Sequence, residues 1–253
     1  LGSAWLGADA RNCFHSCRLH TCLFTGRKQD CLWIHPVGLR RGLDCKRGRL
    51  EPEAVYEFGG TQTGNAEWSP GGAAIVFNSR RGGTSHLYLL DPSTGQARQL
   101  SSAEDGIEPR WSRDGKWIYF VSNRTGGNEV WRMPREGGTA ARVTKNGGST
   151  GQESPDGGHV YFAKGSGLWR VPVGGGAEMK IAGELSCQSN FDVAGNGIYF
   201  MAARGPKRLA CIRFYDFSTG KVRELPDTGK RWWRGIAIAH DGRHLWYSVV
   251  DSE

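Results

Sequence analysis

The sequence predicts an all-β fold, a β-propeller built from four-stranded blades. A unit of about 40 residues recurs along the chain, as expected for propeller blades, and places Trp68 and Trp111 at equivalent positions. Each unit contains four short apolar or aromatic runs divided by Gly, Pro, Asn and Asp, the pattern of strands joined by turns. Glycine is abundant, at 38 of 253 residues, which also favours an all-β class.

The clearest unit runs from Pro109 to Thr144. Its segment 117–121 is aromatic and β-branched and too short for a helix of that hydrophobicity, so it predicts a strand packed on both faces. The preceding Asp114-Gly115 predicts a turn, because Asp bonds nearby backbone and Gly accepts a positive φ. Residues 129–133 and 141–144 follow as the third and fourth strands.

Four further copies of this pattern are visible in the sequence. They cover residues 66–100, 153–172, 191–225 and 236–248, and the last contains only a first and a second strand. Residues 54–58 lie where the outermost strand of a preceding blade is due. We therefore expect an incomplete propeller over residues 54–253, with about four complete blades from a parent of six or more.

Residues 1–53 do not follow the repeat. They carry five of the seven cysteines and three histidines, at Cys13, Cys17, Cys22, Cys31, Cys45, His15, His20 and His35. No Cys-x-x-Cys pair occurs, so the spacing does not support a zinc site. Three interpretations remain open: a disulfide framework, a disordered Arg- and Gly-rich segment, or coding DNA read in the wrong frame.

The formal charge of +8 is unevenly distributed. Residues 1–50 hold nine Lys or Arg against three Asp or Glu, so the propeller itself is close to neutral. Such a balance gives no nucleic-acid footprint on the propeller. No apolar run is long enough to span a bilayer, and no signal-peptide pattern is present in this sequence.

The repeated motif resembles the WD-like repeat of TolB-type proteins, with its Trp-Ser-Pro-Asp-Gly consensus, over residues 54–253. Four departures from that consensus occur: Gly71 replaces the turn Asp, Arg113 the turn Pro and Glu153 the Trp, and the copy at residues 191–225 lacks the Ser-Pro pair. The departures concern single turns, whereas the recurring pattern supports the fold. The resemblance also extends to the sensor domains of bacterial winged-helix regulators.

One set of residues recurs in the turn between the first and second strands, and we assign it a structural role. A carboxylate ring could bind a cation, but Asp before Gly is explained by backbone hydrogen bonding, and neighbouring copies are too far apart to share one ion. We therefore predict no metal site there. The set is Asp114, Gly115, Asp156, Gly157, Asp241 and Gly242.

Four residues are the candidates for ligand binding. Trp232 and Trp233 are adjacent aromatic residues with cationic neighbours and fit the repeat poorly. Arg80 and Arg124 end second strands, where they either pair with carboxylates of the adjoining blade, which we favour, or line a rim that recognises anions. Ser149 lies in a Gly-rich stretch that we interpret as a connector between blades, not as a nucleophile turn.

The sequence contains no nucleophile elbow, phosphate-binding loop or zinc-peptidase motif. We therefore expect a non-catalytic module without a cofactor, which binds a protein or small ligand at one mouth of the propeller. The resemblance implies a periplasmic or cell-envelope location. The alternative is the substrate-gating propeller of a prolyl-oligopeptidase-like serine peptidase, whose catalytic domain would lie outside this chain.

Overall fold

The computed structural model describes residues 22–24, 31–35, 38–41, 54–56, 63–80, 83–101, 106–204, 209–226, 231–238 and 244–250. Regular structure in these residues consists of strands β1 to β22 and includes no helix. The strands form five separate sheets, and neighbouring strands within each sheet pair in antiparallel fashion. The predicted all-β class is therefore confirmed.

Three of the sheets are complete four-stranded blades in sequence order. The first contains β5 (Thr63–Trp68), β6 (Ile75–Ser79), β7 (His86–Asp91) and β8 (Gln96–Gln99). The second contains β9 (Ile107–Trp111), β10 (Trp117–Ser122), β11 (Glu129–Pro134) and β12 (Ala141–Arg142). The third contains β13 (Ser149–Glu153), β14 (His159–Lys164), β15 (Gly167–Pro172) and β16 (Met179–Ala182).

The remaining sheets lie toward the two ends of the chain. The fourth blade contains β17 (Phe191–Val193), β18 (Gly197–Arg204), β19 (Leu209–Asp216) and β20 (Val222–Glu224). Strands β21 (Arg231–Ile238) and β22 (Leu245–Val250) pair with each other and join this sheet through β19. The N-terminal sheet contains β1 (Cys22–Phe24), β2 (Cys31–His35), β3 (Gly38–Arg41) and β4 (Ala54–Tyr56).

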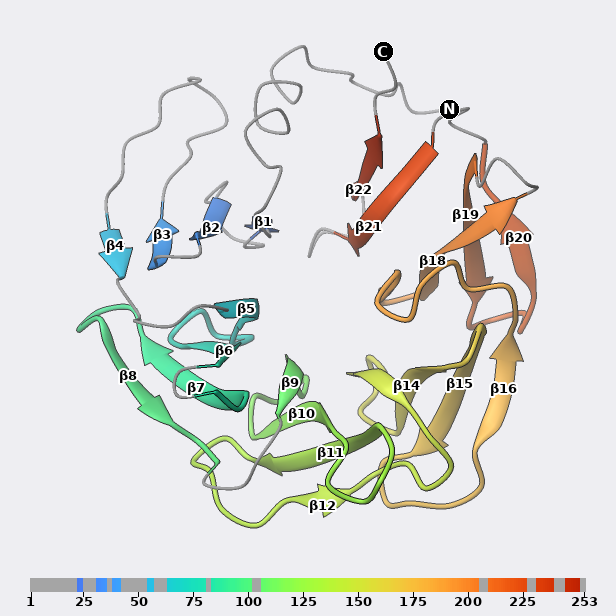
Figure 1. The fold of residues 1–253 in the computed structure, drawn as a ribbon. Coiled ribbons are helices and arrows are strands. Elements are labelled where there is room, and N and C mark those ends of the chain that lie inside the picture. The colour runs from blue at the N-terminus through green and yellow to red at the C-terminus, as the bar shows by residue number, and fades with distance from the viewer. Residues whose placement is uncertain are drawn as a thin grey trace.

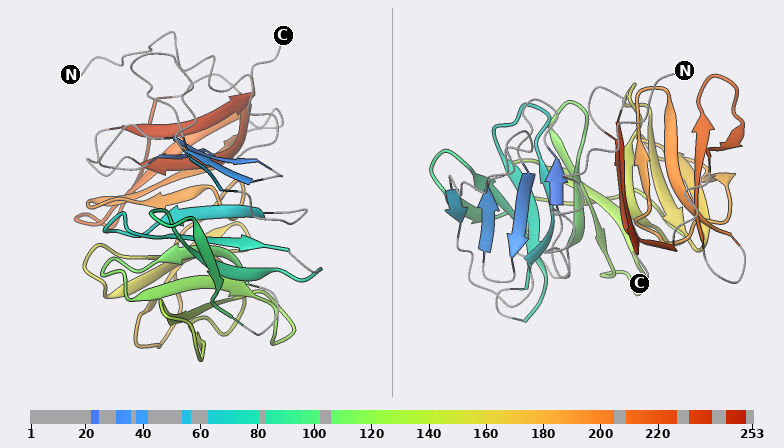
Figure 2. Two further views of the ribbon diagram at one scale, coloured as in Figure 1. Left: turned by 90° about the vertical axis from the view of Figure 1, so that its left-hand side faces the viewer. Right: turned by 90° about the horizontal axis from the view of Figure 1, so that it is seen from above.

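The sheets are arranged around a common axis, as Figure 1 shows, and Figure 2 shows the same ring from two further sides. The first strand of each blade lies nearest the axis, and the fourth, such as β8, β16 or β20, lies at the outer rim. This is the geometry of a β-propeller. The structure thus confirms the fold that the repeat predicts.

The N-terminal sheet contains strands in a segment that the sequence analysis set apart. Strands β1, β2 and β3 fall within residues 1–53, and β4 begins at Ala54. They pair in the same sequential order as the strands of the later blades. The domain boundary at residue 53 stays a prediction, and the rest of the segment lies outside the described residues.

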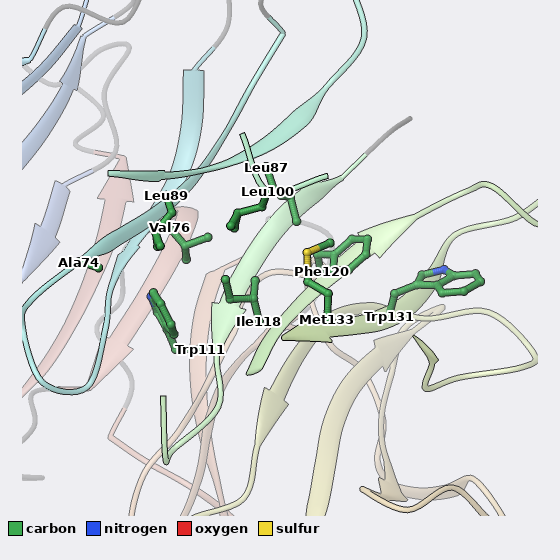
Figure 3. Packing of buried hydrophobic residues seen from close by; sticks show 10 residues of the cluster. All are labelled: Ala74, Val76, Leu87, Leu89, Leu100, Trp111, Ile118, Phe120, Trp131 and Met133. Carbon is green, nitrogen blue, oxygen red and sulfur yellow. The ribbon is translucent and has the colours of Figure 1, made fainter. Parts of the chain in front are cut away.

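The core lies between the blades. Figure 3 shows one cluster, in which Val76 and Leu89 of the β5–β8 blade meet Ile118 and Phe120 of the β9–β12 blade. Trp111 lies in the same cluster with 6% of its surface exposed. A second cluster joins the β9–β12 blade to the β13–β16 blade and includes Phe162. Each blade therefore buries its apolar faces against its neighbours, as propeller blades must.

The turns between first and second strands are held by the residues singled out from the sequence. In one blade the Ser112 hydroxyl donates to Asp114 Oδ1 over 2.7 Å, and Gly115 has a φ of 70°. Hydrogen bonds from Ser112 and from backbone lower the pKa of Asp114. The equivalent turn has a 2.5 Å bond from Ser154 to Asp156, and Gly157 there also has a φ of 70°. Asp241 and Gly242 lie outside the described residues.

Candidate functional site

The antiparallel order places the sequence-predicted binding residues on one face of the ring. Ser79 at the end of β6 pairs with Thr63 at the start of β5, so the ends of second strands lie beside the starts of first strands. Arg80 follows β6 directly, and Trp232 and Trp233 lie in the first half of β21. We call this side, where β5, β9, β13 and β21 begin, the entry face. The opposite side, which carries the turns of Asp114 and Asp156, is the exit face.

Arg124 contacts aromatic rings of its own blade. Its guanidinium lies 4.8 Å from the ring centroid of Trp131 and 5.4 Å from that of Phe120, and its Nε donates to Ser122 Oγ over 2.9 Å. Desolvation lowers the pKa of Arg124. Among the described residues Arg124 has no ion pair with a carboxylate of the adjoining blade, because the turn after β10 folds the side chain back over these rings. Arg80 is exposed.

The inner strands share an irregularity that the sequence analysis did not detect. In β5, β9 and β13 the pairing register shifts at equivalent points. Asn65, Glu108 and Thr150 occupy these bulges with φ values of 46°, 52° and 51°. A left-handed backbone is uncommon for residues other than glycine and disfavours them by about 1–2 kcal/mol each. The bulge in β21 contains Gly235, for which a φ of 111° is unstrained.

The bulge side chains of two neighbouring blades meet. Thr150 Oγ1 donates to Glu108 Oε2 over 2.5 Å, which joins β13 to β9. Thr150 is buried, Glu108 is half-buried and Asn65 is exposed. The bulges therefore present polar side chains at the entry-face end of the inner strands.

Ser149 belongs to the first strand of its blade and not to a connector. It opens β13, where its hydroxyl lies 3.0 Å from Gln188 Oε1 and 3.4 Å from the Ala163 carbonyl oxygen. The sequence interpretation as a connector is wrong for residues 149–151, which lie in β13, because burial between blades compensates for the weak strand pattern of Ser-Thr-Gly, whereas residues 147–148 precede the strand. Gln188 is an amide and cannot serve as a general base, so this geometry does not activate the serine.

Below the bulges, equivalent side chains of the inner strands bond to the next blade. Glu67 Oε2 accepts from the Trp111 N–H over 2.7 Å, and Asp192 Oδ2 accepts from the Ile238 N–H over 2.7 Å. Gln152 Oε1 accepts from the Val193 N–H over 3.1 Å. These contacts are inter-blade hydrogen bonds, two made by carboxylates and one by a neutral amide.

Arg110 occupies the same position in β9, where a guanidinium cannot accept a hydrogen bond. Its Nη1 instead lies 3.7 Å from Glu67 Oε1. At the junction of β9 with β13, the acceptor lies in the later blade and the donors lie in the earlier one. Glu153 there accepts from the Arg113 N–H over 2.6 Å and from the Tyr119 hydroxyl over 2.8 Å.

Glu67 and Asp192 lie where desolvation disfavours the ionised form of a carboxyl group. Desolvation raises the pKa of Glu67, and the charge of Asp192 adds to this effect, although Arg110 and the Trp111 N–H oppose it. Desolvation also raises the pKa of Asp192, against the charges of Arg110 and Arg113. The ionised forms are therefore less favourable here than in water.

We expect Glu67→Gln to remove part of the pH dependence of folding. Because the folded-state pKa of Glu67 is raised, its contribution to stability is fully present below the unfolded pKa and is lost as the pH rises through the folded pKa. A glutamine can accept the same Trp111 N–H, as Gln152 does at its own junction. Urea denaturation between about pH 4 and pH 7 should show a flatter stability profile in the variant. If the free energy of unfolding changes with pH as steeply in the variant as in the parent chain, the assignment is contradicted.

Arg113 links three blades at the exit face. Besides its backbone bond to Glu153, its Nη2 donates to the Val193 carbonyl over 2.8 Å and its Nε to the Glu153 carbonyl over 3.4 Å. The repeat consensus has proline at this position, which could make none of these bonds. The departure noted in the sequence thus adds contacts that no other described turn makes.

The described residues offer no group of three or more His, Cys, Asp and Glu that could hold a metal ion. That part of the chain also contains no helical segment with the length and apolarity needed to cross a bilayer.

The family is established by comparison with known proteins. A family model described as the TolB beta propeller domain matches residues 50–210, well over half of the chain. The chain belongs to the TolB-type propeller family. A relative with 35% identity over 100 residues is an uncharacterised protein of Agrobacterium fabrum. The match covers 38% of this chain and 33% of the length of that relative.

Solved structures share the fold at low identity. A protein of Agrobacterium tumefaciens classed as TolB has a TM-score of 0.72 and 20% identity, covering 92% of this TolB-type chain and 90% of that one. TolB from Acinetobacter baumannii has a TM-score of 0.64 and 17% identity, covering 80% and 52%. A puromycin-hydrolysing peptidase of Mycobacterium tuberculosis has a TM-score of 0.60 and 16% identity, covering 82% and 37%. The chain thus spans about half of one TolB and about a third of a peptidase.

Proposed function

We propose that this TolB-type propeller is a non-catalytic module that binds a protein segment or small ligand at the entry face. The observation that supports this most is the set of bulges at Asn65, Glu108 and Thr150. Glycine would adopt the same backbone without strain, as Gly235 does. Polar side chains retained in a strained backbone are typical of binding sites, where the side chain is needed for a contact.

The sequence-predicted binding residues support the same face. Arg80 and Arg124 follow second strands, and β21 carries Trp232 and Trp233 near its start. Aromatic and arginine side chains are enriched where proteins bind partners. Within a longer protein, such a module would serve as an envelope scaffold or as the sensor half of a regulator.

A peptide selection tests this proposal. A random linear peptide library displayed on phage is selected against the chain, and bound peptides are remade in soluble form. Binding should weaken about tenfold in Asn65→Arg, which places a long side chain on the entry face. It should stay unchanged in the control Lys116→Ala, because Lys116 lies on the exit face beside Asp114. Peptides that lose affinity only in the exit-face variant would show that the proposed face is wrong.

A second candidate is the substrate gate of a serine peptidase, and the fold shared with the puromycin-hydrolysing peptidase favours it. On that hypothesis the nucleophile would lie in another domain of a longer protein. A fluorophosphonate probe should then label the full-length gene product but not the chain described here. Labelling of this chain, lost in Ser149→Ala, would contradict both candidates.

A further inference from the structure

We propose that Glu108 is the anchor of the entry-face site and that it binds the ammonium group of a lysine side chain on a peptide partner. This inference rests on the proposed binding function and specifies its ligand. Its starting point is the carboxylate itself, which is half-buried and held by the bulge of β9. A fixed carboxylate near the axis is suited to recognise a cation.

The surroundings of Glu108 differ from those of three other glutamates that lie beside a cation. Glu129 lies 2.5 Å from Arg142, Glu178 lies 3.0 Å from Lys164, and Glu67 lies 3.7 Å from Arg110. Among the residues that the structure describes, Glu108 has Thr150 as its hydrogen-bond partner and no ion pair. Loss of water from a carboxylate is costly unless hydrogen bonds or a cation compensate for it, and Glu108 has one such hydrogen bond among the described residues. A ligand would supply the cation that the described part of the chain does not.

The hydrogen bond between Thr150 and Glu108 determines which kind of group a ligand must provide. The single hydroxyl proton of Thr150 is donated to Glu108 Oε2, so only acceptor capacity remains at that hydroxyl. An ionised carboxylate also offers acceptors alone. The complementary group is therefore a donor, and a positive charge makes the bond shorter and stronger.

The geometry also favours ammonium over guanidinium. Thr150 occupies one acceptor site of Oε2 and leaves both acceptor sites of Oε1 open. A guanidinium binds carboxylates best through two parallel N–H bonds to both oxygens, whereas an ammonium acts as a compact point charge. The hydrogen bond from Thr150 to Oε2 hinders a guanidinium from binding both oxygens of Glu108. It does not hinder an ammonium from binding Oε1.

Inner-strand charges below the bulges are compatible with this ligand. Glu67 and Asp192 belong to β5 and β17, and each is within electrostatic range of Arg110. Arg113 also acts on both carboxylates, so two carboxylates face two guanidinium groups, and this region carries no excess positive charge that would repel a cationic side chain. The exposed amide of Asn65 lies at the equivalent bulge of the neighbouring blade and can bond the peptide backbone.

The test uses the full chain and a fluorescein-labelled, Nα-acetylated hexalysine, measured by fluorescence anisotropy at about 0.15 M salt. We expect Glu108→Gln to weaken binding about tenfold or more, because it removes the charge while retaining a side chain of the same shape. The matched control is Glu136→Gln. Glu136 is 74% exposed, pairs with Arg98 and Arg135, and undergoes the same change of net charge. Its binding should stay within about twofold of the parent chain, since exposed pairs contribute little.

Variants of Thr150 separate positioning from charge. Thr150→Val removes the hydroxyl and should weaken hexalysine binding several-fold, whereas Thr150→Ser keeps the hydroxyl and should restore it. Loss of the Thr150 bond also frees Oε2, so the preference for hexalysine over hexaarginine should decrease in Thr150→Val. A merely structural role for Thr150 would change stability without changing this preference. Thermal melts of each variant verify that it is folded.

Several outcomes would overturn the inference. They are no binding of hexalysine, equal weakening by the Glu108 and Glu136 variants, tighter binding of hexaarginine in the parent chain, or binding of calcium alone at Glu108. If peptides from the phage selection still depend on Asn65, the proposed function stands and only the lysine anchor fails. If nothing binds at the entry face, both proposals fail.

Discussion

Replacement of Phe162 by alanine should lower the free energy of unfolding by about 3–5 kcal/mol. Phe162 has no exposed surface and packs in the cluster that joins the β9–β12 and β13–β16 blades, against Tyr119 and Val130. Truncation removes apolar contacts from both blades and leaves a cavity that rigid sheets cannot close. Urea denaturation monitored by tryptophan fluorescence measures the effect.

The control for Phe162 is Val222→Ala. Val222 is 41% exposed on the outer strand β20, so its truncation should change stability by less than about 0.5 kcal/mol. If the two variants unfold at the same urea concentration, the interface between the blades is not the stabilising core that the structure describes.

Replacement of Glu129 by alanine should cost about 3 kcal/mol of stability. The side chain is 6% exposed and accepts hydrogen bonds from Arg142 Nη2 and Thr144 Oγ1 at 2.5 Å each, and from the Gly147 N–H at 3.1 Å. Without the carboxylate, three donors lose their acceptor. The Thr144 hydroxyl is among them, and because Thr144 is buried, water replaces the lost acceptor poorly. The fold of the connector from β12 to β13 depends on these bonds.

The matched control is Glu136→Ala, which removes a carboxylate that is 74% exposed and paired with Arg98 over 3.2 Å. An exposed ion pair contributes at most about 1 kcal/mol. Equal losses in the Glu129 and Glu136 variants, measured by thermal and urea unfolding, would mean that burial of Glu129 is not what makes its bonds important.

The fold could be predicted from the sequence because each blade is specified locally. The predicted strands starting at Trp117 and Glu129 begin where β10 and β11 begin. An aromatic and β-branched run between turn residues allows few alternatives. Repetition then supplies the long-range information, since a module that cannot bury its faces alone must stack on copies of itself.

The inner strands were less predictable. Ser149, Thr150 and Gly151 lack a strand pattern, and the structure nevertheless places them in a buried strand. The sign of φ at Glu108 cannot be read from a residue type that rarely adopts the left-handed region. Alignment of the repeats could have drawn attention to Asn65, Glu108 and Thr150, because they precede the equivalent of Trp68 by the same distance.

Side-chain partners were also beyond the sequence. Arg124 was expected to meet a carboxylate, and instead lies over the rings of Phe120 and Trp131. Glu129 and Arg142 were not predicted to interact, although their pairing is among the most buried in the described residues. Both outcomes depend on how turns direct side chains in space, which strand patterns do not encode.

Arg113 changes how this propeller should come apart. In an array whose modules touch only adjacent modules, opening can start anywhere and spread one module at a time. Arg113 extends from the turn after β9 to the carbonyls of Glu153 in β13 and Val193 in β17. Separation of any one of these three blades breaks a hydrogen bond of Arg113, so we expect the three to open together, with their slowest amide protons exchanging at a common rate.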